Sequence, residues 1–119
     1  MSKGEQLIKD FLDKQKISYI QEKRVGDTRM RFDFYLDELN IVIEYQGAQH
    51  YKPIKARGGW EAYEYQLERD TRKREYCREN CIGLIEVPYY APDIIDFLER
   101  RLKLIEIWRK NPAWCKNCT

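Results

Sequence analysis

The sequence lacks long hydrophobic runs: none of its 119 residues belongs to an uninterrupted apolar stretch longer than three. A helix that crosses a membrane needs about 20 such residues, so no membrane association is predicted. The first residues also lack the apolar centre of a signal peptide, and we therefore expect a cytoplasmic protein.

The chain also lacks a strong excess of one charge. Its 22 Lys and Arg residues stand against 20 Asp and Glu residues, which gives a net charge of +2 and excludes a histone-like polycation. Any binding of nucleic acid must then come from local basic patches. Repeats and low-complexity linkers are absent too, and 43% hydrophobic residues suffice for one core. We expect one domain over residues 1–110 and a loosely held tail over 111–119.

Cysteine and histidine are scarce, with four and one residue respectively. In a reducing compartment the cysteines are expected to be free thiols or metal ligands. Cys115 and Cys118 have the spacing of half a zinc site, and Cys77 and Cys81 are the only candidates for the other half. Because Cys77 also fits a helix core position, a structural zinc is not expected.

Periodicity predicts an α/β protein. Helices are expected over 3–16, 60–80 and 93–109, and strands over 17–22, 29–36, 41–46 and 82–87. The element order α-β-β-β-α-β-α includes a β-hairpin and a βαβ crossover, so the last strand should run parallel to strand 41–46 in a mixed sheet flanked by helices. Phe32, Phe34 and Leu36 should share one face of the sheet, and Asp33 and Tyr35 the other.

The hairpin places two carboxylates together. A turn centred between Glu38 and Leu39 would oppose Asp33 to Glu44, with Cβ atoms about 4.5–5.5 Å apart. Such like charges repel, and a hard divalent cation such as Mg²⁺ removes the conflict. Alternatively, both acids lie at a wet sheet edge with Lys or Arg partners.

Other polar residues follow the second hairpin strand. Gln46 should share the face of Glu44, where it could position water or phosphate, or simply be solvated. His50, in a long polar loop over 47–59, is a candidate general base, general acid or ligand, or a surface residue.

Two further acidic residues, Asp70 and Glu5, can each be interpreted in two ways. Asp70 falls within an apolar stripe of helix 60–80, and is either functional or paired with Lys73. That stripe comprises Trp60, Tyr63, Leu67 and Cys77. Glu5 closes a capping box with Ser2, or points toward the carboxylate pair.

Basic residues gather near this acidic site and suit a phosphate backbone, although a charge-rich helix face is also typical of solvent exposure. They are Arg29, Arg31, Lys52, Lys55 and Arg57 beside the loop, and Arg69, Arg72, Lys73, Arg74 and Arg78 on the helix.

Taken in order, the segments RFDFYL, IVIEYQGAQHY, GGW and ERDTRKREYCRENCIGLIEVPY resemble the Vsr-like branch of the PD-(D/E)XK nucleases. They are similar to the EDxHD-type nucleases and homing endonucleases of phages and large DNA viruses, over about residues 3–90. The resemblance implies a restriction-endonuclease-like fold, Mg²⁺-dependent hydrolysis of DNA, with Mn²⁺ able to substitute, and a bacterial, phage or viral protein.

The resemblance also implies roles for individual residues. Asp33 matches the metal-binding Asp and Glu44 the acidic slot of the second strand. We expect both to bind Mg²⁺, with the carbonyl of Tyr45 or Gln46 as a further candidate ligand. His50 matches the Vsr-type histidine. Asp70 matches the helix Asp, and Glu5 the N-terminal Glu.

Two departures from the family pattern matter. Gln46 stands where many relatives have a catalytic Lys, which shifts the activation of water to His50 or the metal. The ligands of the Vsr zinc are also missing.

The sequence thus predicts a metal-dependent endonuclease or nickase acting on double-stranded or nicked DNA, as a monomer or homodimer. The DNA contacts are expected from Arg29, Arg31, Lys52, Lys55, Arg57, Arg72 and Lys73. The alternatives are a catalytically silent nucleic-acid-binding module, or subunit of a nuclease complex, and a small zinc-dependent interaction domain.

Overall fold

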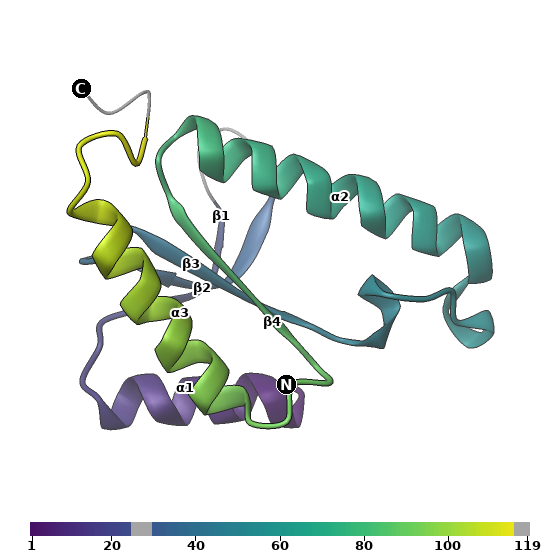
Figure 1. The fold of residues 1–119 in the computed structure, drawn as a ribbon. Coiled ribbons are helices and arrows are strands. Elements are labelled where there is room, and N and C mark those ends of the chain that lie inside the picture. The colour runs from purple at the N-terminus through teal and green to yellow at the C-terminus, as the bar shows by residue number, and fades with distance from the viewer. Residues whose placement is uncertain (25–29, 116–119) are drawn as a thin grey trace.

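The computed structural model describes residues 1–24 and 30–115; Arg29, Cys118 and the expected turn at Gly26-Asp27 lie outside them. The elements in chain order are α1 (Lys3–Lys14), β1 (Ile20–Arg24), β2 (Arg31–Leu36), β3 (Ile41–Gln46), the short 3₁₀ helices η1 (Ala48–His50) and η2 (Lys55–Arg57), α2 (Gly59–Glu79), β4 (Gly83–Pro88) and α3 (Ile94–Arg109), as Figure 1 shows.

The four strands form one mixed sheet in the order β1-β2-β3-β4. β1, β2 and β3 are antiparallel neighbours, whereas β4 runs parallel to β3. The hairpin pairs Leu36 with Ile41 and Phe34 with Ile43, which is the predicted register. The predicted α/β class, element order and crossover are therefore confirmed.

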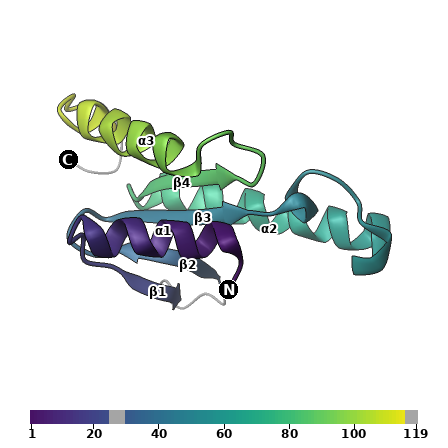
Figure 2. The ribbon, with the colours of Figure 1, turned by 90° about the horizontal axis from the view of Figure 1, so that it is seen from below.

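Helices cover both faces of this sheet (Figure 2). α1 and α3 pack on one face over the larger core cluster, which includes Ile8, Phe34, Ile43, Ile85 and Leu98. α2 lies on the opposite face, where a smaller cluster of Phe32, Val42 and Cys77 is buried. The small size of this second core leaves room for polar side chains between α2 and the sheet.

Some predicted boundaries were wrong. α1 ends at Lys14 rather than at residue 16, because Lys16 adopts a left-handed φ of 57° and the Ile17 N–H donates to the Leu12 carbonyl. β1 accordingly starts at Ile20. β4 includes Pro88, which was expected to stop it; an edge strand tolerates proline, since the missing N–H need not face a neighbour.

The expectation that Phe32 shares a face with Phe34 and Leu36 was also wrong. Phe32 packs with Val42 and Cys77 on the α2 side, whereas Phe34 and Leu36 belong to the other core cluster. The ladder between β2 and β3 ends at Phe34 and Ile43, and the Asp33 N–H donates to the Glu44 side chain instead of to a strand carbonyl. Asp33 is missing from both ladders of β2, and Glu22 on the neighbouring β1 has a left-handed φ of 50°, so the regular alternation of side chains is interrupted at Asp33.

The cysteines depart from the expectation of free thiols. Cys81 and Cys115 form a disulfide across 34 residues, so the chain beyond α3 is tied to the start of β4 as far as Cys115. Cys77 is free and buried in the smaller core cluster, as its helix position predicted.

No helix within residues 1–24 and 30–115 has the length and apolar character needed to span a bilayer.

Gly4 allows α1 to approach the end of β3 closely. A Cβ atom at Gly4 would lie 2.2 Å from Cε1 of Tyr45, which is far inside van der Waals contact. We expect Gly4→Ala to lower the free energy of unfolding by about 1–3 kcal/mol, because the Tyr45 ring must move. Urea denaturation measures this, with Lys3→Ala on the exposed side of the same turn as control. Equal stability of Gly4→Ala and the wild type would contradict the close packing.

Candidate functional site

The site begins where β2 and β3 part. Beyond the Phe34–Ile43 pair, each strand bonds to a carboxylate of the other: the Asp33 N–H donates to Glu44 Oε2 at 3.1 Å, and the Tyr45 N–H donates to Asp33 Oδ2 at 2.7 Å. These reciprocal bonds hold both carboxylates between the strands. The two carboxylates meet as predicted, although Asp33 and Glu44 are not a directly opposed pair of the ladder, which ends at Phe34 and Ile43.

A lysine from α2 accompanies this pair. Lys73 forms an ion pair with Glu44 Oε1, and its ammonium also lies 5.3 Å from the centre of the Phe32 ring. Both partners are largely withdrawn from water, with side chains only 12% and 10% exposed. The sequence predicted Lys73 as a DNA contact or as the partner of Asp70; the structure places it on Glu44 instead.

The acidic pair carries electrostatic tension. Burial and the nearby charge of Glu44 raise the pKa of Asp33 to about 7, although the Tyr45 N–H and Lys73 favour its ionised form. Burial beside the carboxylate of Glu44 therefore opposes the ionisation of Asp33. A cation would relieve this tension.

His50 and Asp70 form a second pair. η1 carries His50 directly beyond β3, and its Nδ1 lies 2.9 Å from Asp70 Oδ2 on α2. Because an ionised carboxylate only accepts hydrogen bonds, Nδ1–H is the donor and Nε2 is the nitrogen free to accept a proton. The pair is nearly buried, so the ring orientation is well fixed.

Asp70 is one of two buried residues of α2, but the apolar stripe expected around it is not a core. Trp60 and Leu67 are exposed, and Asp70 is instead surrounded by polar partners. Burial opposes its ionisation, yet the hydrogen bond and charge of His50, together with the Gln66 amide 2.9 Å away and Arg74, lower its pKa. Asp70 therefore stays ionised beside the imidazole.

Gln46 belongs to a polar network that the sequence analysis missed. Its amide donates to Glu86 at 2.6 Å and its carbonyl oxygen accepts from the Tyr51 hydroxyl at 2.6 Å. Arg74 donates to the same Glu86 carboxylate at 2.9 Å. Glu86 stands beside Glu44 in the parallel register of β3 and β4. The sequence could have revealed this neighbour, because the predicted crossover makes β3 and β4 parallel and their segments IVIE and GLIE end in Glu at matching positions.

Tyr45 and Glu5 are the two other predicted site residues. Tyr45 packs its ring against α1, and because the N–H and C=O of a strand residue face the same neighbour, its carbonyl also points toward β2 and Asp33. Ser2 caps α1 by accepting from the Glu5 N–H, and the Glu5 carboxylate accepts from the Ser2 hydroxyl, each at 3.2 Å. Within the described residues Glu5 makes no hydrogen bond or ion pair with either acid of the pair.

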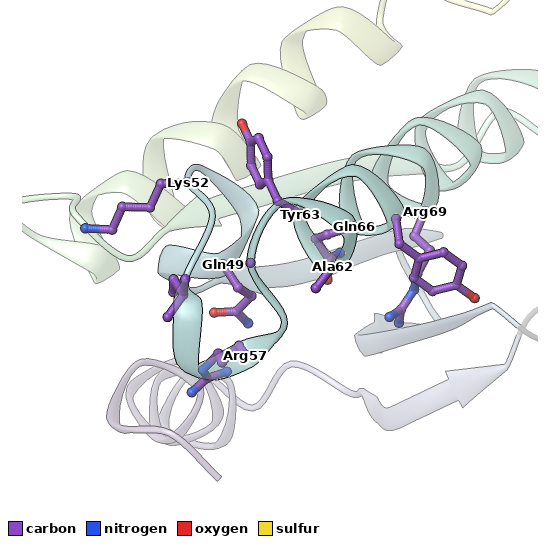
Figure 3. Close-up of a pocket in the computed structure, with 10 residues that line it drawn as sticks. Gln49, Lys52, Arg57, Ala62, Tyr63, Gln66 and Arg69 are labelled. Atoms are coloured by element: carbon purple, nitrogen blue, oxygen red, sulfur yellow. The ribbon is translucent and has the colours of Figure 1, made fainter.

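Basic side chains border the site in two hollows along α2. The first, of about 350 Å³, lies between the loop after β3 and the start of α2 (Figure 3). Lys52 and Arg57 from the loop and Arg69 from α2 line it, with Gln66, the partner of Asp70, at its wall. Lys55, also predicted to contact DNA, is exposed in η2 and does not line it.

The second hollow, of about 560 Å³, lies between the β1–β2 end of the sheet and α2. Its lining includes the cations Arg24, Arg31, Arg69, Arg72 and Lys73. Tyr65 and Arg69 line both hollows, and the Arg69 guanidinium lies 5.8 Å from the centre of the Tyr65 ring. A basic strip therefore runs along α2 past the carboxylate pair; Arg24 and Arg69 join the predicted set.

The donor set fits a hydrated divalent ion better than a closed metal cage. In the part of the chain that the structure describes, no three His, Cys, Asp or Glu side chains converge as a ready ligand set. Asp33 and Glu44 with the Tyr45 carbonyl offer only oxygen donors, and they leave positions for water and phosphate. Mg²⁺ is commonly bound by one or two carboxylates in this manner.

Comparison with known proteins gives uncharacterised viral relatives. The chain is 42% identical over 79 residues to protein 307L of Invertebrate iridescent virus 6, covering 66% of this chain and 40% of that protein. It is 41% identical over 75 residues to protein 094L of Frog virus 3 (isolate Goorha), covering 61% and 48%. Protein 033L of Invertebrate iridescent virus 3 is 33% identical over 114 residues, covering 86% and 58%. The chain thus spans about half the length of these relatives.

No protein-family model matches the sequence. Among solved structures, the catalytic domain of homing endonuclease I-Bth0305I is similar, with a TM-score of 0.59 and 18% sequence identity. The match covers 92% of this chain and 97% of that domain. The two chains therefore share a fold.

Asp33→Asn should stabilise the protein in a pH-dependent way. The pKa of Asp33 is about 7 in the folded state against 3.8 for the unperturbed group, so wild-type stability falls as pH rises through this window. Asparagine keeps the acceptor for the Tyr45 N–H without the charge. Without added metal, we expect Asp33→Asn to be about 1–3 kcal/mol more stable than wild type at pH 8, and equal to it near pH 4.

Urea unfolding at the two pH values measures this difference. Asp37→Asn, in the exposed β2–β3 turn, serves as the control and should leave the pH dependence unchanged. A variant at position 33 that is less stable than wild type at pH 8 would show that the carboxylates are not in conflict.

Proposed function

We propose that this chain is a Mg²⁺-dependent endodeoxyribonuclease of the Vsr-like PD-(D/E)XK type that nicks or cuts DNA. The observation that carries the proposal is the meeting of Asp33 and Glu44 at the point where β2 and β3 part. The fold shared with a homing-endonuclease catalytic domain and the ordered resemblance of the motifs support it.

Asp33, Glu44 and the Tyr45 carbonyl are the residues that would hold the metal. When bound, Mg²⁺ supplies neutralisation of charge on the scissile phosphate and a lowered pKa of coordinated water. The carboxylates bring the charge that makes a divalent ion favourable in this half-buried place. The hydrogen bonds from the Asp33 and Tyr45 N–H groups fix their orientation.

His50 is the group that moves a proton. Its Nε2 accepts a proton from water or returns one to the leaving oxygen, while Asp70 holds the ring in the required tautomer and stabilises the imidazolium. Gln46 is not the missing lysine of the family pattern: its amide is engaged by Glu86 and Tyr51. We therefore assign Gln46 a structural role in the site and not the activation of water.

The basic strip along α2 would hold the phosphate backbone on both sides of the acids. Arg24, Arg31, Arg69 and Arg72 approach from one hollow, and Lys52 and Arg57 from the other. Such contacts give affinity without sequence preference.

Single substitutions in the site should abolish cleavage while the fold persists. For Asp33→Ala, Glu44→Ala and His50→Ala, we expect supercoiled-plasmid nicking with Mg²⁺ to fall by about 10²- to 10⁴-fold, because metal binding or proton transfer is lost. Time courses on agarose gels measure the rate, and circular dichroism reports the fold. Glu38→Ala, in the β2–β3 turn, is the control and should cleave as the wild type does.

Wild-type activity in all three variants would refute the assignment. Binding of DNA without cleavage by the wild-type protein, with either Mg²⁺ or Mn²⁺, would instead show a silent binding module.

Arg69→Ala should weaken DNA binding through loss of a phosphate contact. We expect the slope of log Kd against log salt concentration to decrease in magnitude by about 1. Fluorescence anisotropy with a labelled duplex across a salt series measures the slope. Arg100→Ala removes an equal charge from the opposite face on α3, where Arg100 pairs with Asp96, and should leave the slope unchanged. Equal slopes for Arg69→Ala and wild type would place the DNA elsewhere.

A further inference from the structure

Lys73 lies between two surroundings of opposite charge. Its ammonium is paired with Glu44 Oε1, beside the carboxylate of Asp33, and its side chain also lines the basic hollow of about 560 Å³ between the sheet and α2. It is the cation that directly contacts the carboxylate pair among the described residues. Arg74, its neighbour on α2, is held by Glu86 instead.

The position of the ammonium is the position that a divalent ion would need. Asp33 and Glu44 offer few carboxylate oxygens in this half-buried place, and one of them, Glu44 Oε1, is taken by Lys73. A second cation on the same oxygen would be repelled by the first. Lys73 and a metal ion therefore exclude one another at Glu44.

The Lys73 ammonium has a neighbouring hollow into which it can move when it leaves Glu44. The ammonium lies 5.3 Å from the centre of the Phe32 ring, and the flexible lysine side chain also lines the hollow of Arg31, Arg69 and Arg72, so a rotation of that side chain would carry the ammonium into the hollow. The charged side chains that line that hollow are positive, so an anion beside the freed ammonium would be favourable. A phosphate group of the substrate is the anion that the basic strip suits.

We infer that Lys73 is a resident counter-cation of the Asp33–Glu44 pair, which a divalent metal displaces and which then binds the scissile phosphate. This inference rests on the proposed nuclease function. It gives the chain, from α2, the ammonium that Gln46 does not provide from β3. It also couples the two ligands: metal binding frees the lysine, and phosphate in the hollow favours the freed lysine and hence the metal.

Mn²⁺ binding without DNA tests the exchange separately from cleavage. At pH 8, electron paramagnetic resonance of free Mn²⁺ should show Lys73→Met and Lys73→Gln binding the ion about 5- to 100-fold more tightly than wild type. A lysine that served only the fold would give the opposite sign or no change. Lys103→Met, an identical substitution on the exposed side of α3, should bind as wild type does, and Asp33→Asn should lose the site.

Single-turnover cleavage at saturating Mn²⁺ completes the test. Both Lys73 variants should cleave at least about tenfold more slowly than wild type, since the phosphate contact is missing even when the metal is bound. If wild type binds Mn²⁺ and cleaves but the Lys73 variants bind no more tightly, or cleave as fast, the exchange is refuted and the nuclease survives. If wild type shows no Asp33-dependent Mn²⁺ binding, the inference and the proposed metal site fail together.

Discussion

The repulsion between Asp33 and Glu44 is the constraint around which the rest of the site is arranged. The sheet brings the two carboxylates together at its one place where β2 and β3 stop pairing, and it binds each of them through a backbone N–H of the other strand. Burial raises the cost of their charge. The ammonium of Lys73, from α2, offsets part of that cost by pairing with Glu44. One ammonium beside two carboxylates still leaves the pair with less positive than negative charge.

One face of the sheet carries the larger apolar core, and the other carries the polar residues of the candidate site. α1 and α3 cover the larger apolar cluster, which anchors β2, β3 and β4 through residues such as Phe34, Ile43 and Ile85. On the other face α2 buries little apolar surface, and its buried residues are Asp70 and Cys77. A rigid apolar layer thus holds the backbone, while the polar layer under α2 holds ionised groups at fixed positions.

The fold and the acidic pair were predictable because they depend on local patterns. Apolar alternation and the position of the turn determine the hairpin register, and extending that register one residue beyond Phe34 and Ile43 brings Asp33 near Glu44. The contact of Lys73 with Glu44 depends on how α2 crosses the sheet, which no spacing in the sequence determines. The face of Phe32 was missed because side-chain alternation is interrupted at Asp33, which neither neighbouring strand pairs. The Cys81–Cys115 disulfide was missed because residues 34 apart meet only through the packing of α3.

A crystal grown with Mn²⁺ and a short DNA duplex tests the central claim most directly, through the anomalous scattering of the metal. We predict an anomalous peak in contact with the carboxylates of both Asp33 and Glu44. A peak bound elsewhere, for example only at His50 and Asp70, or its absence from crystals in which the DNA lies along α2, would contradict it.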